Sequence, residues 1–228
     1  VKTAIGAQAQ GKKGRETRLA ADKTLASGTD PRAAMRQYMT AVTVDPNDVE
    51  AWTGLARSLL AIKPDANTGS ERYELPMNAS AAAYIAYERA RAPDAKARAL
   101  AVLGEALKRR SFWRPAIDAM RISLAHAENA EVRKSYEALR NEHGFRMMDY
   151  KVENEAADPR LCIQFSERLQ RGTVDPAKFV AVDGRETDNL SGEARQLCVD
   201  GLAHGKRYEI TIRAGRPSEI GETLLKPA

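Results

Sequence analysis

Between residues 31 and 142 the apolar positions recur three and four residues apart, which is the period of amphipathic helices. The same stretch is rich in Ala, Leu, Arg and Glu, and most of these residue types favour helix. After residue 146 the pattern changes to an alternation of apolar and polar residues, which is typical of strands. This change of period predicts an α+β chain with a helical domain over 1–145 and a β domain over 146–228.

The helical part is expected to contain a series of separate helices joined by short turns. Their predicted ranges are 15–26, 31–44, 48–62, 78–91, 95–109, 114–127 and 130–141. Asp30-Pro31 and Pro93-Asp94 indicate helix starts, because Asp caps a helix N-terminus and Pro suits the first turn. Gly144 is expected to end the last helix.

Small and large apolar residues recur along these helices in a fixed order. The first set is Ala34, Tyr38, Ala41 and Pro46, followed by Trp52, Leu55, Ala56 and Leu59. The second set is Ala83, Tyr87 and Ala90, then Leu100, Leu103, Gly104 and Leu107, then Ala116, Met120 and Ser123. This order resembles the tetratricopeptide repeat, a helix-turn-helix unit of about 34 residues. The resemblance implies stacked helical hairpins with residues 63–78 as an inserted loop, and a bundle without repeats is the alternative.

Three runs in the second half alternate with a period of two, at 161–165, 196–199 and 207–212. Together with the turn signals between them, they predict five to seven short strands in a small antiparallel β-sandwich. Cys162 and Cys198 both fall on the strand face opposite the apolar residues. This shared facing predicts a disulfide and therefore an oxidising compartment, whereas two free thiols in a cytosolic protein are the alternative.

Three strings in the β half carry a second resemblance. They are DPRLCIQFSE at 158–167, LCVDGLAHGKRY at 197–208 and RAGRPS at 213–218. Together they resemble the N-terminal region of bacterial alpha-2-macroglobulin-like proteins. The resemblance implies a periplasmic protease trap in which a helical extension precedes the first β-sandwich, and it makes this chain a piece of a longer protein. Neither cysteine begins a Cys-Gly-Glu-Gln thioester signature, so covalent trapping of target proteases is not expected within this chain.

Composition and charge narrow the class of protein. With 43% hydrophobic and 29% charged residues, the chain is neither disordered nor collagen-like. No apolar run approaches the roughly 20 residues that a membrane helix needs. The net charge is +5, and the excess of basic residues lies in residues 1–146, with 24 Lys and Arg against 17 Asp and Glu. This excess predicts a solvated helical surface or contact with nucleic acid, anionic lipid or an acidic partner.

The residues of catalytic and metal sites are scattered. His126, His143 and His204 show no metal-ligand spacing, and the sequence has no Cys-x-x-Cys motif and no Gly-rich phosphate loop. Ser166, next to a strand, and His204, in a turn, are the one pairing that nucleophilic catalysis would need, but Ser166 lacks the surroundings of a nucleophile elbow and reads as a polar strand end. We therefore expect no enzymatic activity, no metal and no cofactor.

A basic run, Lys108-Arg109-Arg110, precedes Phe112 and Trp113. Cations neutralise phosphates and aromatic rings stack on bases, so this segment is a candidate patch for nucleic acid or an acidic peptide. The alternative is that the two aromatic side chains fill the seam between helical hairpins.

In the repeat family the inner helix of each hairpin lines a concave groove that holds extended peptides. Counting along the predicted inner helices places six residues on that face: Glu50, Thr53, Arg57, Arg98, Glu105 and Lys108. Their mixed charge predicts binding of a protein or peptide partner, and the alternative is a spacer whose concave face packs on other domains of the same protein. We therefore expect a non-catalytic scaffold module of a periplasmic protease inhibitor, with a free-standing repeat adaptor as the other reading.

Overall fold

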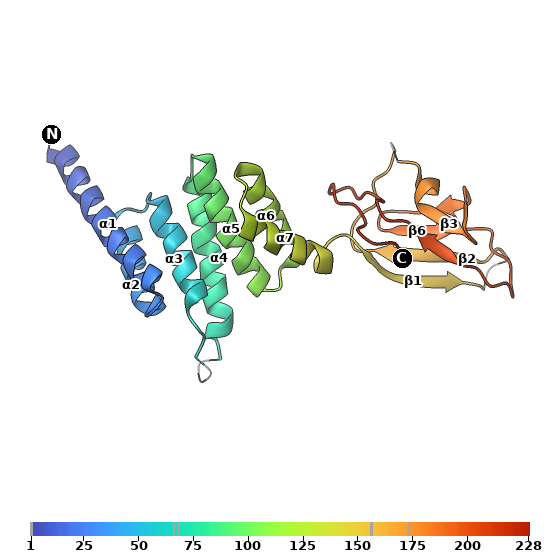
Figure 1. The fold of residues 1–228 in the computed structure, drawn as a ribbon, viewed down its shortest axis with the longest axis horizontal. Coiled ribbons are helices and arrows are strands. Elements are labelled where there is room, and N and C mark those ends of the chain that lie inside the picture. Colours follow the sequence, from blue (N-terminus) through green and yellow to red (C-terminus); the bar gives the residue numbers. More distant parts are fainter. Residues whose placement is uncertain (1, 66, 68, 156, 173) are drawn as a thin grey trace. The chain divides into compact units, whose positions relative to one another are not determined.

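The computed structural model describes residues 2–65, 67, 69–155, 157–172 and 174–228, with side chains from residue 13 onward. The chain divides into two compact units, residues 1–139 and residues 140–228. Figure 1 shows helices in the first part of the chain and strands in the second.

The helices of the described residues correspond one by one to the predicted ones. They are α1 (Lys2–Ser27), α2 (Pro31–Val44), α3 (Val49–Ala61), α4 (Glu71–Arg89), α5 (Pro93–Arg109), α6 (Trp113–His126) and α7 (Ala130–His143). Asp30 caps α2 by accepting from the Ala33 amide, as its sequence position predicts. Asp94 does not cap α5, because the helix begins one residue before it, at Pro93.

The predicted loop over 63–78 is only partly correct, because α4 already begins at Glu71. Pro76 lies inside α4, where it has no amide hydrogen to donate to the carbonyl four residues earlier. Leu75 and Pro76 are both buried, and Leu75 belongs to the hydrophobic core of the helical unit. Burial of this apolar face favours helix at a position where the proline alone indicates a break.

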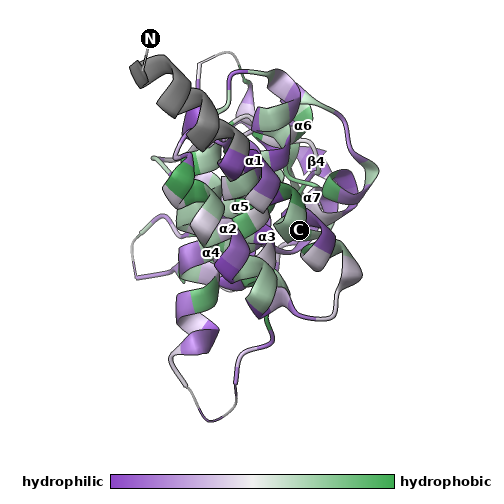
Figure 2. Cartoon of the chain, turned by 90° about the vertical axis from the view of Figure 1, so that its left-hand side faces the viewer, coloured by the Kyte–Doolittle hydropathy of each residue, from purple (hydrophilic) through white to green (hydrophobic). Residues whose placement is uncertain are grey.

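Successive helices form antiparallel hairpins that stack on one another. Each helix packs on the next along the chain from α1 to α6, and α3 also packs on α1 and α5. The helices α1, α3 and α5 therefore form one layer, and α2, α4 and α6 lie against it. In Figure 2 hydrophilic and hydrophobic residues both occur around the helices, as expected for amphipathic helices with one buried face.

Most residues of the predicted repeat pattern are the ones that fill this helical core. Those with less than a tenth of their surface exposed are Ala34, Tyr38, Ala41, Leu55, Ala56, Leu59, Ala83, Ala90, Leu100, Ala116, Met120 and Ser123. Gly104 lies against Met120, and a Cβ atom there would approach the Met120 side chain to 2.7 Å. The helical unit is thus a tetratricopeptide-like stack of hairpins, in which small residues allow the close approach of neighbouring helices.

The β unit contains two antiparallel sheets. The first sheet has the order β1-β2-β6-β5, formed by β1 (Met147–Glu153), β2 (Arg160–Phe165), β6 (Gln196–Val199) and β5 (Leu190–Ser191). The second has the order β4-β3-β7, formed by β4 (Arg185–Glu186), β3 (Val180–Val182) and β7 (Ile210–Ile212), and a short 3₁₀ helix, Pro176–Phe179, precedes β3. The predicted runs at 161–165 and 196–199 correspond to β2 and β6, whereas only the end of the run at 207–212 forms a strand.

The core of the β unit is formed by the facing residues of the two sheets. Ile163, Phe165, Leu197 and Val199 come from the first sheet, and Val180 and Ile212 come from the second. Phe145 joins this cluster, and its amide donates a hydrogen bond to Glu222 Oε2 (2.8 Å). Phe145 therefore belongs to the β unit, although the sequence boundary at 145/146 assigned it to the helical domain. The architecture is α+β, with helical hairpin repeats followed by a small antiparallel β-sandwich, as predicted.

Candidate protein-binding groove

The inner helices α3 and α5 bring together two of the predicted groove residues. Arg98 on α5 donates to Glu50 on α3, with 2.5 Å between Arg98 Nη2 and Glu50 Oε1. Both side chains are more than two-fifths exposed, so the pair lies at the surface and contributes little to stability. Its effect is to join two neighbouring hairpins and to fix the position of the Arg98 side chain.

Glu105 and Lys108 also pair with each other, one turn apart on α5. The distance between Lys108 Nζ and Glu105 Oε2 is 3.2 Å, and Arg109 Nε lies 3.5 Å from the other Glu105 oxygen. Arg109 also donates to the Leu60 carbonyl at the end of α3. These three charged residues therefore connect α5 internally and to α3.

The expectation for Thr53 is wrong, because its side chain is buried rather than presented in a groove. Thr53 is 1% exposed, and its hydroxyl donates to the Val49 carbonyl of the same helix (2.9 Å). It lies on α3, which packs against both α1 and α5, so neighbouring helices close over this part of its surface.

Arg57 and Arg98 line the same cavity, which has a volume of about 270 Å³. It lies where α3 and α5 meet the end of α6 and the start of α7, and its lining residues are Arg57, Asp94, Ala97, Arg98, Ala101, Ser123, Ala127, Glu128, Asn129 and Val132. Ser123 is buried and donates to the Ala97 carbonyl (2.7 Å), which holds α6 against α5 at the floor of the cavity. The sequence analysis did not identify the α6–α7 residues that line this cavity. The turn at 127–129 occupies the same position in the repeat as the turn at Pro46, and this correspondence could have indicated them.

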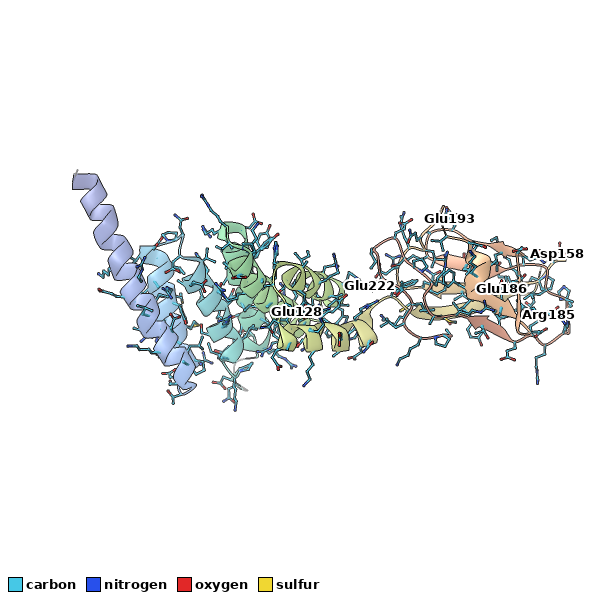
Figure 3. All side chains as sticks on the ribbon, turned by 45° about the horizontal axis from the view of Figure 1, so that its top comes forward. Glu128, Asp158, Arg185, Glu186, Glu193 and Glu222 are labelled. Atoms are coloured by element: carbon cyan, nitrogen blue, oxygen red, sulfur yellow. A yellow bond between two sulfur atoms is a disulfide. The ribbon has the colours of Figure 1, made fainter. Side chains whose placement is uncertain are left out.

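The charges of this cavity are only partly neutralised. Glu128, labelled in Figure 3, pairs with Arg133 at 2.5 Å, and this guanidinium lowers the pKa of the Glu128 carboxyl. Asn129 accepts from the amide of Val132 (3.1 Å) and thereby caps α7. Within the described part of the chain, Arg57 forms no ion pair, and its side chain is exposed. Arg57 is therefore the cation that this face offers to a ligand.

A partly buried hydrogen-bond network supports the helices beside Arg57. The Tyr38 hydroxyl donates to Asp22 Oδ1 (2.6 Å), and Arg18 bonds both Asp22 (2.9 Å) and Asp48 (3.0 Å). Burial raises the pKa of Tyr38, and the hydrogen bond to Asp22 raises it further, while the nearby Arg57 opposes the shift. Tyr38 therefore stays neutral at physiological pH and joins α2 to α1 without adding a charge.

The predicted disulfide is confirmed: Cys162 on β2 and Cys198 on β6 are bonded to each other. The two residues are direct partners in the strand register, with their Cα atoms 3.9 Å apart. Both are buried, at 2% and 3% exposure, although they lie on the face opposite Ile163 and Leu197. The disulfide is compatible with an extracellular or periplasmic location.

The basic run before Phe112 makes contacts with other residues of the same chain. Arg110 donates to the Ser80 hydroxyl (2.8 Å), and its guanidinium lies 4.4 Å from the centre of the Phe112 ring. Trp113 packs on the core of α6 and α7, as the seam interpretation expects, but Phe112 is 47% exposed. These contacts favour a structural role for the segment over a nucleic-acid patch.

The residues that the structure describes contain no cluster with metal-binding geometry. Ser166 Oγ accepts from the Arg146 amide (3.1 Å), so it serves as a backbone partner at the end of β2. Within that part of the chain, no three His, Cys, Asp or Glu side chains gather closely enough to hold a metal ion. Its helices also include none that is long and apolar enough to span a bilayer.

Comparison with known proteins gives a fold likeness without an assigned family. No protein-family model matches the chain, and no curated protein matches it. Among solved structures, the chain is similar to the N-terminal domain of stress-induced protein-1 (STI-1) from C. elegans, with 18% identity and a TM-score of 0.44. The match covers 58% of this chain and 98% of that one.

Proposed function

We propose that this chain is a non-catalytic interaction module, whose helical unit binds an extended protein segment along α3 and α5. The observation that carries the proposal is the cavity between α3, α5 and the α6–α7 turn, where Arg57 is exposed and unpaired within the described residues. A cation beside an open cavity suits an acidic side chain or a terminal carboxylate of a peptide. Beside this site the pair Glu50–Arg98 joins α3 to α5, and Arg98 itself lines the cavity, whereas the pair Glu105–Lys108 lies within α5.

The test is a selection from a random peptide library displayed on phage, using the whole chain as bait. We expect the selected peptides to carry an acidic residue and to lose about tenfold in affinity for the Arg57→Gln variant, since one charge-assisted hydrogen bond contributes roughly 1.5–3 kcal/mol. Arg121→Gln is the control, because Arg121 is exposed on α6, outside the inner layer. Equal affinities for wild type and Arg57→Gln, or an equal loss in the control, would contradict the proposal.

The second part of the proposal concerns the protein to which the module belongs. The three strings in the β half, with the buried disulfide between β2 and β6, favour a bacterial alpha-2-macroglobulin-like protease inhibitor of the cell envelope. In that setting the module positions the trap or recruits a cell-envelope partner, and target proteases meet the full-length protein rather than this chain.

This setting makes a prediction about the native polypeptide. An antibody raised against the chain should detect, in cells of the source organism, a protein several times larger than 25.0 kDa that is released with the periplasmic contents. A cytosolic protein of about the size of this chain would instead support the free-standing repeat adaptor. The peptide selection is independent of this outcome, because it tests the groove alone.

A further inference from the structure

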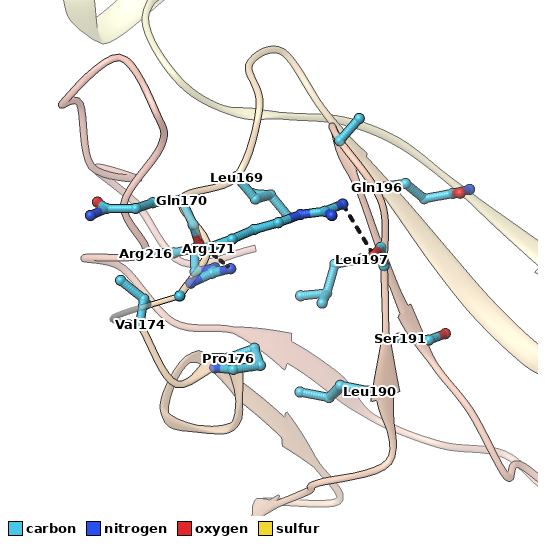
Figure 4. Close-up of a pocket in the computed structure, with 13 residues that line it drawn as sticks. Leu169, Gln170, Arg171, Val174, Pro176, Leu190, Ser191, Gln196, Leu197 and Arg216 are labelled. Atoms are coloured by element: carbon cyan, nitrogen blue, oxygen red, sulfur yellow. Dashed lines mark hydrogen bonds between the residues drawn. The ribbon is translucent and has the colours of Figure 1, made fainter.

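The β unit contains a cavity that is separate from the groove of the helical unit and is not lined by the disulfide. Its volume is about 250 Å³, and it lies between residues 169–172, Val174 and Pro176 on one side and the turn around β5 and Arg216 on the other (Figure 4). Its apolar lining comes from Leu169, Val174, Pro176, Leu190, Ala194 and Leu197. Figure 4 shows Arg171 crossing one side of this space, with Leu190, Leu197 and Pro176 around the rest.

Arg216 is the unusual residue of this cavity. It is 4% exposed, and its Nε and Nη1 atoms are buried without an acceptor. Its contacts are a long hydrogen bond from Nη2 to the Gln170 carbonyl (3.3 Å) and the Phe179 ring, whose centre lies 5.7 Å from Cζ. Burial lowers the pKa of Arg216, but a guanidinium remains charged at neutral pH. A buried cation whose donors lack acceptors is destabilising unless an anion neutralises it.

The described residues around Arg216 supply no such anion. Arg171 lines the same cavity and donates to the Gly192 carbonyl on the opposite side (3.3 Å). The described lining residues include no Asp and no Glu, and Arg216 forms no ion pair within the described chain. Two guanidinium groups therefore border one cavity of mostly apolar lining, which also includes Gln170, Ser191 and Gln196 and has no acidic side chain among its described residues.

We propose that this cavity is a binding site for a carboxylate carried on a short branched apolar body. The guanidinium of Arg216 bonds the carboxylate, and Leu169, Leu190 and Leu197 surround the hydrocarbon. A volume of about 250 Å³ is that of several water molecules at roughly 30 Å³ each, which suits a leucine-sized group. The ligand is either the C-terminal residue of a peptide or a free small acid, since both offer this chemistry.

Isothermal titration of the whole chain with 4-methylpentanoate, and with an acetylated tripeptide ending in leucine, tests the site. We expect saturable binding of at least one of them, and at least tenfold weaker binding of the matching amide, 4-methylpentanamide or the amidated tripeptide. Binding of 4-methylpentanoate but not of the tripeptide would indicate a small-molecule ligand. Tighter binding of the tripeptide would indicate that the ligand is the C-terminus of a protein. If neither carboxylate binds, or if the amides bind equally well, the proposal is overturned.

Two variants identify the residue responsible. Arg216→Met should abolish binding and should raise the melting temperature of the unliganded protein, because it removes an unpaired buried charge while keeping the volume. Arg185→Met is the control, since Arg185 is exposed on β4 outside the cavity (Figure 3), and it should bind as wild type does. A purely structural Arg216 predicts the opposite result, a lower melting temperature and unchanged binding. The comparison of acids with amides on the wild type decides the proposal even where a variant fails to fold.

Discussion

Removing the disulfide with the double substitution Cys162→Ala and Cys198→Ala should destabilise the β unit by about 4 kcal/mol. The two cysteines are 36 residues apart in sequence, and closing a loop of this length restricts the unfolded chain by roughly that amount. The β unit is small, so each kcal/mol corresponds to about 4–8 °C in melting temperature. The expected measurement is therefore a fall of well over 10 °C in the thermal transition of the β unit.

The control for this experiment is the effect of a reductant. The melting temperature of the wild-type β unit should fall when the protein is reduced. The melting temperature of the double alanine variant should not change with reductant, because the variant has no disulfide to break. The helical unit contains neither cysteine, so its unfolding, followed by circular dichroism at the helical band, should change little. Equal melting temperatures for oxidised wild type and the variant would refute a stabilising role of the disulfide.

Gly54→Ala should destabilise the helical unit by about 3 kcal/mol, near the upper end for overpacking a core. Gly54 lies on α3 directly against Tyr38 of α2, and a Cβ atom there would overlap the Tyr38 ring. The ring is 1% exposed and its hydroxyl is bonded to Asp22, so it has no space to move into. This cost exceeds the gain of roughly 1 kcal/mol in helix propensity from glycine to alanine.

Two other glycines serve as matched controls for chemical denaturation. Gly104→Ala meets the flexible side chain of Met120, which can shift, so the loss should be smaller. Gly69→Ala meets nothing within 4 Å and should leave stability nearly unchanged. If Gly54→Ala proved as stable as wild type, the close packing of α2 on α3 would be wrong.

The helices could be predicted from the sequence because their signals are local. The apolar period, Asp30 before α2 and Gly144 after α7 each act within one or two turns. The start of α4 could not be predicted in this way, because Pro76 signals a break locally while burial of Leu75 in the core favours helix. Tertiary packing therefore overrode the local signal at this one boundary.

The binding sites were less predictable because they combine distant segments. Counting along each inner helix predicted that Arg57 and Arg98 share a face, and both line one cavity, but it could not show that neighbouring helices bury Thr53. The sequence carried no signal that Arg216 lines a cavity, since only the fold brings it beside Gln170 and Leu197. The cysteines were predictable because the period of a strand determines their facing, and the register β2–β6 then pairs them directly.

Amide hydrogen exchange of the whole chain, with and without a peptide selected against it, tests the central claim most directly. The account predicts that the peptide slows exchange in α3, α5 and the start of α7, which border the cavity at Arg57, and leaves α2 and α4 unchanged. Protection confined to α2, α4 or the β unit would contradict a groove along the inner helices.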